Sequence, residues 1–325
     1  MSDLIDGLLK GNRRALAKAI TLVESTRSDH QLQAHQMIDA VLPRTGQSMR
    51  VGISGVPGVG KSTFIEALGL FLLERGHRVA ILAVDPSSSV TGGSILGDKT
   101  RMEHLSMRPE AFIRPSPSSG SLGGVAEHTR EALLLCEAAG YDVIIVETVG
   151  VGQSEIAVAG MTDMFVLLQL PNAGDDLQAI KKGIMELADL VVFNKADIDP
   201  HAAQMASAQM RSAISMLRPT SPSWRPPVLT LSALKQEGIA EFWAVVENFR
   251  TTLAASGEFE SRRQHQAISW MWQQIDSALQ GRFRSHPGVK AELPELSKKV
   301  EAGRVTPAAA AQRLLALMDH PVQPL

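Results

Sequence analysis

Residues 49–62 read Met-Arg-Val-Gly-Ile-Ser-Gly-Val-Pro-Gly-Val-Gly-Lys-Ser, and this stretch decides the fold. It begins as a short apolar run, passes through a glycine-rich turn and continues as a helical pattern from Lys61 to about Glu74. Its last eight residues fit the pattern Gly-x-x-x-x-Gly-Lys-Ser/Thr. Because they lie between a predicted strand and a predicted helix, they predict a loop that binds the phosphates of a nucleotide.

The same alternation of apolar strands and helices repeats as far as about residue 255. Continuous apolar strands separated by helices are typical of a parallel sheet that is covered on both faces. We therefore predict a three-layer α/β fold of the P-loop NTPase class, with a mostly parallel sheet, over residues 45–256. The further strands are predicted at 79–84, 142–146, 164–168, 190–193 and 228–231, and the further helices at 125–139, near 177–187 and near 202–217.

Both ends of the chain read as helical extensions. Apolar residues recur at helical spacing over residues 3–42, which predicts two or three helices in an N-terminal extension, 1–44. In the C-terminal segment, 257–325, Thr306 and Pro307 predict the start of a last helix, with Thr306 as its N-cap and Pro307 in its first turn. This segment also carries a broad apolar stripe, which either packs against the protein's own core or forms a dimer surface. The stripe consists of Ile268, Met271, Trp272, Ile275 and Leu279.

Composition indicates an ordinary globular protein. The 325 residues are 44% apolar and 20% charged with a net charge of -2, so nucleic acid is not an expected partner. No apolar run approaches the roughly 18 residues that span a bilayer, and Asp3 and Asp6 interrupt the start, so we expect a cytoplasmic protein. An organellar protein without its transit peptide would read the same. The one cysteine, Cys136, reads as a buried hydrophobe, and the nine scattered histidines do not suggest a transition-metal site.

The phosphate loop predicts a role for each of its residues. Its backbone N–H groups should surround the β-phosphate at a helix N-terminus, where the helix dipole favours an anion. Lys61 should reach the β- and γ-phosphates, Ser62 should place its hydroxyl on Mg²⁺, and Thr63 should support the α-phosphate. The loop residues are Gly55, Val56, Pro57, Gly58, Val59 and Gly60.

Two further loops predict selection of guanine. Asn194-Lys195-Ala196-Asp197 directly follows an apolar strand, and the Asp197 carboxylate can accept hydrogen bonds from the N1–H and the exocyclic amine of guanine. Adenine offers neither donor, so ATP would leave the charge without a partner. We expect Asn194 to join this loop to the phosphate loop and the stem of Lys195 to cover the base. After the next strand, Ser232, Ala233 and Leu234 should supply a backbone N–H for the guanine carbonyl oxygen.

Four residues beyond the phosphate loop are candidates for metal binding and catalysis. Glu147 ends a buried strand and could hold Mg²⁺ through water, and the N–H of Gly150 could contact the γ-phosphate. Asp85 ends the second strand, where ligands bind in such sheets, and Asp98 lies in a glycine-bracketed loop that suits a switch residue. With Lys61, these form the predicted catalytic group, and Ser62, Asp85, Asp98 and Glu147 form the predicted metal ligands.

Two features bear on turnover and on partners. Val151 occupies the position where Ras-like GTPases have a water-orienting glutamine, which predicts slow intrinsic hydrolysis unless Gln153 or a partner supplies the missing group. The acidic then basic stretch from Gly174 to Lys182 reads either as a capped, solvated helix start or as another switch that touches a partner in the GTP-bound state.

Beyond the phosphate loop, four long runs of sequence closely resemble the MeaB/ArgK family. The resemblance implies a homodimeric GTPase, joined through its C-terminal segment, that binds GTP or GDP with Mg²⁺. It further implies a chaperone that gates loading of adenosylcobalamin into methylmalonyl-CoA mutase, or a related acyl-CoA mutase, and protects that enzyme. The runs are Val-Asp-Pro-Ser-Ser-Ser at 84–89, Gly-Gly-Ser-Ile-Leu-Gly-Asp-Lys-Thr-Arg-Met at 92–102, Val-Glu-Thr-Val-Gly-Val-Gly-Gln-Ser-Glu at 146–155 and Gly-Asp-Asp-Leu-Gln at 174–178.

Two other functions fit the same fold class. A nickel-delivery GTPase would need a cluster of cysteine and histidine ligands, which the sequence does not display. A transport-associated kinase would transfer the γ-phosphate to a protein acceptor, and labelled nucleotide would separate transfer from hydrolysis.

Overall fold

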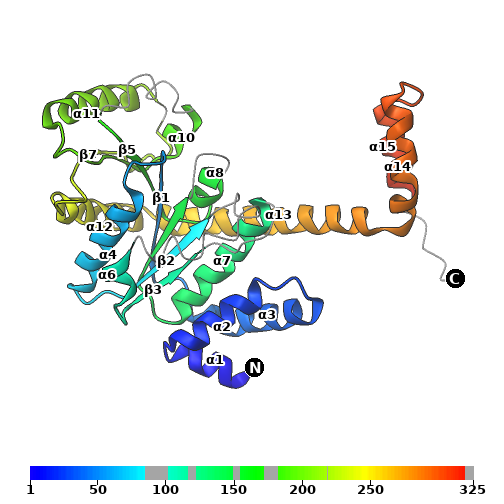
Figure 1. Cartoon of the computed structure of the whole chain (residues 1–325), viewed down its shortest axis with the longest axis horizontal. Coiled ribbons are helices and arrows are strands. Elements are labelled where there is room, and N and C mark those ends of the chain that lie inside the picture. Colours follow the sequence, from blue (N-terminus) through cyan, green and yellow to red (C-terminus); the bar gives the residue numbers. More distant parts are fainter. Residues whose placement is uncertain (85–101, 116–121, 149–153, 172–181, 218, 319–325) are drawn as a thin grey trace. The chain divides into compact units, whose positions relative to one another are not determined.

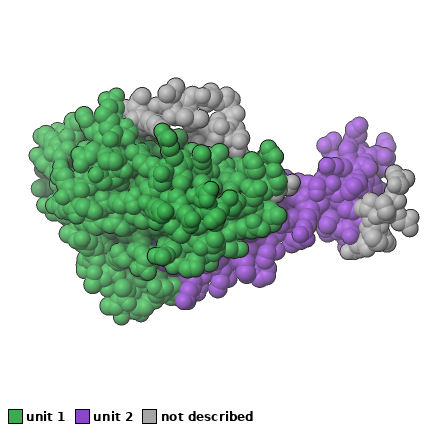
Figure 2. Space-filling view, turned by 90° about the horizontal axis from the view of Figure 1, so that it is seen from below, with its two compact units in different colours: residues 1–262 green, residues 263–325 purple. Residues whose placement is uncertain are grey.

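The computed structural model describes residues 1–84, 102–115, 122–148, 154–171, 182–217 and 219–318. They belong to two compact units, residues 1–262 and residues 263–325, which are coloured separately in Figure 2. Among the described residues, no helix combines the length and the apolar character that crossing a membrane requires.

The first unit is built on a seven-stranded sheet in which all the described strands run parallel. The strand order is β3-β2-β4-β1-β5-β6-β7, so β1, which leads into the phosphate loop, lies at the centre. Every predicted strand is confirmed. The strands are β1 (Met49–Gly55), β2 (Val79–Val84), β3 (Ala111–Arg114), β4 (Val143–Thr148), β5 (Met164–Gln169), β6 (Leu190–Phe193) and β7 (Val228–Thr230).

The sequence did not predict β3, the short helices α6 (Glu103–Ser106) and α8 (Ser154–Ala159), or the longer helix α12 (Ile239–Ser256). β3 has four residues and, among the described strands, pairs with β2 alone at the edge of the sheet. Its apolar run, Ala111 to Ile113, has only three residues and ends at Arg114, so it does not stand out from a loop, and its pairing with β2 is what makes it a strand.

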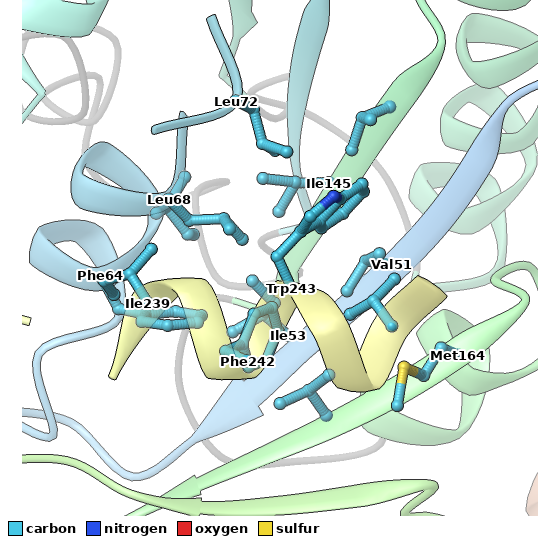
Figure 3. Close-up of a cluster of buried hydrophobic side chains, with 14 of the residues drawn as sticks. Val51, Ile53, Phe64, Leu68, Leu72, Ile145, Met164, Ile239, Phe242 and Trp243 are labelled. Carbon is cyan, nitrogen blue, oxygen red and sulfur yellow. The ribbon is translucent and has the colours of Figure 1, made fainter. Parts of the chain in front are cut away.

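Helices cover both faces of the sheet, which confirms the predicted three-layer fold (Figure 1). One face packs against α4 (Lys61–Leu73), α6 and α12 (Ile239–Ser256). Figure 3 shows Ile239, Phe242 and Trp243 of α12 in one buried cluster with Phe64 of α4 and with Val51 and Ile53 of β1. The other face packs against α7 (Leu122–Ala138), α8 (Ser154–Ala159), α10 (Lys182–Leu187) and α11 (Pro200–Ser215). Cys136 is buried within α7, as expected of a small hydrophobe.

Three N-terminal helices pack on the outside of α7: α1 (Ser2–Leu9), α2 (Arg13–Val23) and α3 (Ser28–Val41). A short 3₁₀ helix, Leu42–Arg44, leads from them to β1. The helices bury Leu8, Leu16, Ile20 and Met37 completely in the same hydrophobic cluster as α7. The predicted N-terminal extension is thus part of the core of the first unit.

The long helix α13 (Glu258–Ser285) begins in the first unit and is followed by α14 (Pro287–Glu301) and α15 (Pro307–Ala316). α14 was not predicted, because Pro287 and Gly288 read as a break. They do end α13, but Pro287 also lies in the first turn of α14. A backbone N–H at this position has no partner within the helix, so a proline, which lacks that N–H, is well tolerated there. Val289, Leu296, Ala310 and Leu314 form a small core in the second unit. On α13 the predicted apolar stripe is exposed, with Trp272 at 57% and Met271 at 50%.

Candidate nucleotide-binding site

The phosphate loop and both predicted base-recognition loops follow strands at the carboxyl edge of the sheet. The first follows β1, and the other two follow the adjacent strands β6 and β7. In open parallel sheets, ligands bind at this edge, because the loops there converge and the helix N-termini point toward it.

Backbone conformation explains two of the glycines in the phosphate loop. Gly58 and Gly60 have φ of 80° and 93°, a region that side chains disfavour. A Cβ atom on Gly60 would also lie 2.7 Å from Nδ2 of Asn194, so a side chain at this position would displace Asn194. Gly60 caps the N-terminus of α4, which leaves the first N–H groups of that helix directed toward the loop.

Lys61 lies at the first position of α4 and folds back over the phosphate loop. Its Nζ donates to the carbonyl oxygen of Gly55 at 2.7 Å. The ammonium group therefore lies where the backbone N–H groups of the loop would hold the phosphates of a nucleotide. This arrangement can neutralise charge on the β- and γ-phosphates, which is the main requirement of phosphoryl transfer.

Asn194 joins the three loops of the site. Its side chain is buried, and Nδ2 donates to the carbonyl of Val59 at 2.9 Å. Its Oδ1 accepts from the backbone N–H of Lys195 at 2.8 Å and from that of Ala233 at 3.0 Å. One amide side chain thus sets the positions of the phosphate loop and both base-recognition loops relative to one another.

Lys195 has a strained backbone, with φ of 61°, which is uncommon for a residue other than glycine. Its Nζ donates to the carbonyl of Gly58 at 2.8 Å, so its stem extends from the base-recognition loop to the phosphate loop. Strain of this kind persists only where surrounding contacts enforce it, and such positions cluster at functional sites.

Asp197 has the features of a guanine acceptor. Its Oδ1 is buried and has no hydrogen-bond partner within the described part of the chain. A hydrogen bond with the Ser232 side chain lowers the pKa of the Asp197 carboxyl, and it outweighs the opposing effect of desolvation; a backbone hydrogen bond and then the charges of Lys235 and Lys195 lower this pKa further. The carboxylate is therefore ionised at neutral pH, and it holds an unused acceptor for an N–H donor of a base.

The backbone N–H groups of residues 232–234 are not equivalent. That of Ser232 donates to the carbonyl of Glu237 at 3.0 Å, and that of Ala233 donates to Asn194. Among these three, only the Leu234 N–H has no partner within the described residues, so it is the donor available to the guanine carbonyl oxygen. Gln236 has a φ of 58° and makes the turn that pairs Ser232 with Glu237. The sequence did not single out this residue, and the one nearby feature that indicated a turn was Gly238.

The metal side of the site is described in part. Glu147 is buried near the end of β4, opposite Ile53 of β1, and the hydroxyl of its neighbour Thr148 donates to the Ser54 hydroxyl at 3.0 Å. Ser62 follows Lys61 in the first turn of α4. Hydroxyl and carboxylate oxygens are donors that suit Mg²⁺, which usually combines one or two of them with phosphate oxygens and water.

Several predicted residues lie outside the described part of the chain. They are Asp85, Asp98, Gly150, Val151, Gln153 and the stretch from Gly174 to Lys181. The described residues contain no group of three or more histidine, cysteine, aspartate or glutamate side chains that could hold a metal ion. An Mg²⁺ ion bound largely by nucleotide phosphates does not require such a group.

Known proteins resemble this chain over nearly its whole length. A probable GTPase of Mycobacterium tuberculosis is 57% identical over 322 residues, covering 98% of this chain and 96% of that protein. The GTPase ArgK of Escherichia coli is 53% identical over 280 residues, covering 86% and 85%. The mitochondrial methylmalonic aciduria type A homolog of Mus musculus is 49% identical over 323 residues, covering 96% and 78%.

A solved structure and a family model agree with these relatives. The crystal structure of a LAO/AO transport system kinase superposes with a TM-score of 0.79 at 40% identity and covers 98% of this chain and 97% of that one. The family model described as methylmalonyl Co-A mutase-associated GTPase MeaB matches residues 16–288. With its guanine-type loops and its phosphate loop at one edge of the sheet, the chain belongs to the MeaB family of P-loop GTPases.

Proposed function

We propose that this GTPase is a chaperone of methylmalonyl-CoA mutase or a related acyl-CoA mutase. In this proposal, GTP binding and hydrolysis gate the loading of adenosylcobalamin into the mutase and protect the mutase from inactivation. The observation that carries it is the match to the mutase-associated family over residues 16–288. The likeness to a methylmalonic aciduria type A homolog supports the same assignment.

The proposed hydrolysis relies on placement and charge neutralisation. Lys61 and the N–H groups of the phosphate loop would bind the β- and γ-phosphates, while Asp197 and the Leu234 N–H would hold guanine. Mg²⁺, when bound, supplies charge neutralisation at the phosphate oxygens, and Ser62 and Glu147, with Asp85 and Asp98, would hold it. Gly150 would contact the γ-phosphate, which GTP has and GDP lacks, so the conformation of the protein would depend on which nucleotide is bound.

We also propose that the protein is a cytoplasmic homodimer joined through its C-terminal segment. The exposed stripe on α13 supports this, because an amphipathic helix with several half-exposed apolar side chains favours a partner surface. Analytical ultracentrifugation of the full chain tests this proposal. Replacement of Trp272 and Ile275 by glutamate should then yield a monomer that still binds GDP.

Co-purification tests the chaperone proposal. Candidate adenosylcobalamin-dependent mutases would be mixed with the protein in GDP or in a non-hydrolysable GTP analogue, and mutase binding, cofactor loading and GTP turnover would be read together. We expect mutase binding and loading to differ between the two nucleotides. Equal binding and equal loading in both states would contradict the gating role.

The LAO/AO transport system kinase keeps a second function open to test, since that structure's name refers to a kinase. Incubation with GTP or ATP labelled at the γ-phosphate separates the two reactions. We expect labelled inorganic phosphate from GTP, whereas label retained on a protein would favour the kinase.

A further inference from the structure

A pocket of about 160 Å³ lies between α10, α11 and the connection that leads from α11 to β7. All three belong to the first unit, and α10 and α11 can be followed in Figure 1. The pocket also borders Ala188, shortly before β6, and Pro226, shortly before β7. It is therefore at the amino ends of these two strands, whereas the base-recognition loops follow their carboxyl ends.

Two arginines line this pocket. Arg211 belongs to α11 and Arg225 to the connection, and both are exposed. Nη2 of Arg211 donates to neutral acceptors at long distances, the Ser207 hydroxyl at 3.3 Å and the Val228 carbonyl at 3.4 Å. Neither arginine has a carboxylate partner within the described part of the chain. A guanidinium group in this situation can donate two parallel hydrogen bonds to the oxygens of a carboxylate or a phosphate.

The sequence around the two arginines adds positive charge. Residues 200–236 contain three arginines and a lysine but no aspartate or glutamate, although the whole chain has a net charge of -2. A surface region of one sign raises the local concentration of ligands of the opposite sign. Glu186 of α10 also lines the pocket, and repulsion from its carboxylate would direct the charged group of an anionic ligand toward α11 and the connection.

Much of the remaining wall is apolar, with side chains from Met185, Ile214, Leu217 and Pro226. Ligand sites commonly combine such a lining with a few polar groups that fix the orientation of the ligand. The volume is similar to that of an engineered cavity of about 150 Å³ that binds benzene. The pocket thus suits an anionic group joined to an apolar body of about this size.

The part of the connection that carries Arg225 is held in place. The side chain of its neighbour Trp224 is buried, and Nε1 donates to the carbonyl of Asp189 at 2.8 Å. The Trp224 N–H donates to the Ser221 hydroxyl at 3.0 Å. Four prolines restrict the backbone of the connection further. A wall that is fixed in advance allows a ligand to bind without the cost of ordering the site.

We propose that this pocket binds a small organic anion, whose carboxylate or phosphate group lies on Arg211 and Arg225 and whose apolar group lies against Ile214 and Met185. The site is separate from the nucleotide site, because the two lie at opposite ends of β6 and β7. Guanine nucleotide should therefore not displace the anion. The inference does not depend on the proposed chaperone role.

The test uses 4-fluorobenzoate and 4-fluorophenyl phosphate, which join a carboxylate or a phosphate to an apolar ring and can be followed by fluorine NMR. The full chain would be saturated with GDP and Mg²⁺, so that the phosphate loop is occupied. For ligands with about ten non-hydrogen atoms, we expect a Kd on the order of 1 mM for at least one probe, and the tighter probe identifies the preferred oxyanion. 4-Fluorobenzamide, which lacks the charge, should bind about tenfold more weakly or worse.

Substitutions locate the site. Arg211→Gln and Arg225→Gln each remove one cation from an exposed position, so the fold should be retained and the Kd of the tighter probe should rise about tenfold. Ile214→Trp fills the apolar part of the pocket and should abolish binding. Arg250→Gln is the matched control, because Arg250 is also exposed and donates to one backbone carbonyl, that of Gln47 at 3.2 Å, but does not line the pocket. Its Kd for the probe should equal that of the wild type.

Four results would overturn the inference. The first is that neither probe binds the GDP-saturated protein at about 10 mM, tenfold above the expected Kd. The second is an equal Kd in Arg211→Gln, Arg225→Gln and Arg250→Gln, which would place the probe elsewhere. The third is binding of 4-fluorobenzamide as tight as that of 4-fluorobenzoate and 4-fluorophenyl phosphate, which would show that the arginines do not select an anion. The fourth is displacement of the probe from nucleotide-free protein by GDP, which would place it in the nucleotide site.

Discussion

Replacing Asp197 by Asn is the most direct perturbation of base selection. The Oδ1 atom of Asp197 is buried without a partner among the described residues, and its lowered pKa keeps the side chain ionised. Guanine would donate to it from N1–H and from the exocyclic amine, and each hydrogen bond to a charged group contributes about 1.5–3 kcal/mol. Asparagine keeps one acceptor oxygen but turns an amide NH₂ toward the second donor.

We therefore expect Asp197→Asn to lose at least one such bond and to weaken GDP binding about 10- to 100-fold. Xanthosine diphosphate carries a carbonyl in place of the amine, so it should bind this variant better than it binds the wild type. Isothermal titration calorimetry with GDP, xanthosine diphosphate and ADP measures all three affinities.

Asp199→Asn is the matched control for this substitution. Asp199 caps α11 by accepting from the N–H of Ala202 at 2.9 Å, and asparagine caps equally well, so GDP affinity should not change. ADP binding to the wild type as tightly as GDP, or GDP binding to Asp197→Asn with unchanged affinity, would refute the assignment of Asp197 to guanine.

Three further predictions concern stability and reactivity. Glu137→Gln should lower the free energy of unfolding in urea by about 3 kcal/mol, because it leaves the largely buried Arg50 without its counter-charge. Ser221→Ala, which lies away from that ion pair, is the control variant. Burial raises the pKa of Glu137, but hydrogen bonds and charge from Arg50 outweigh this effect and hold the pKa below its usual value. The ion pair therefore stabilises the folded protein above about pH 4.3, the pKa of an unfolded glutamate, and this stabilisation is lost as the pH falls through the lower pKa of the folded state. A urea midpoint with the same acid dependence in wild type and Glu137→Gln would contradict this. Gly60→Ala should lose more thermal stability than Gly58→Ala, since both have positive φ but only a Cβ at position 60 would meet another side chain; equal melting temperatures would show that the contact is relieved. Burial raises the pKa of the Cys136 thiol, so iodoacetamide at pH 8 should modify it only in denaturant, and rapid modification of the native protein would contradict its buried position.

The strands were predictable because they are locally encoded. Six of the seven strands contain an apolar run, which fills the whole strand in β2 and β6. Burial on both faces of a parallel sheet favours such runs wherever the strand lies in the order. The edge strand β3 escaped prediction since its identity depends on pairing with β2. α14 escaped because the proline that ends one helix also starts the next.

By itself, the sequence determined the chemical identity of the nucleotide site. In the proposed site, the glycines, Lys61 and Asp197 would act through properties of single residues at short spacing, namely a permitted positive φ, a cation and a carboxylate.

Only the tertiary structure decided how these groups are held together. Asn194 bonds to residues 135 and 39 positions away, and this use of the Ala233 N–H leaves the Leu234 N–H for the base. In the same way, Arg130 meets Gly160 across 30 residues. No local pattern encodes such pairs, because which donor meets which acceptor depends on the order in which the strands lie side by side in the sheet.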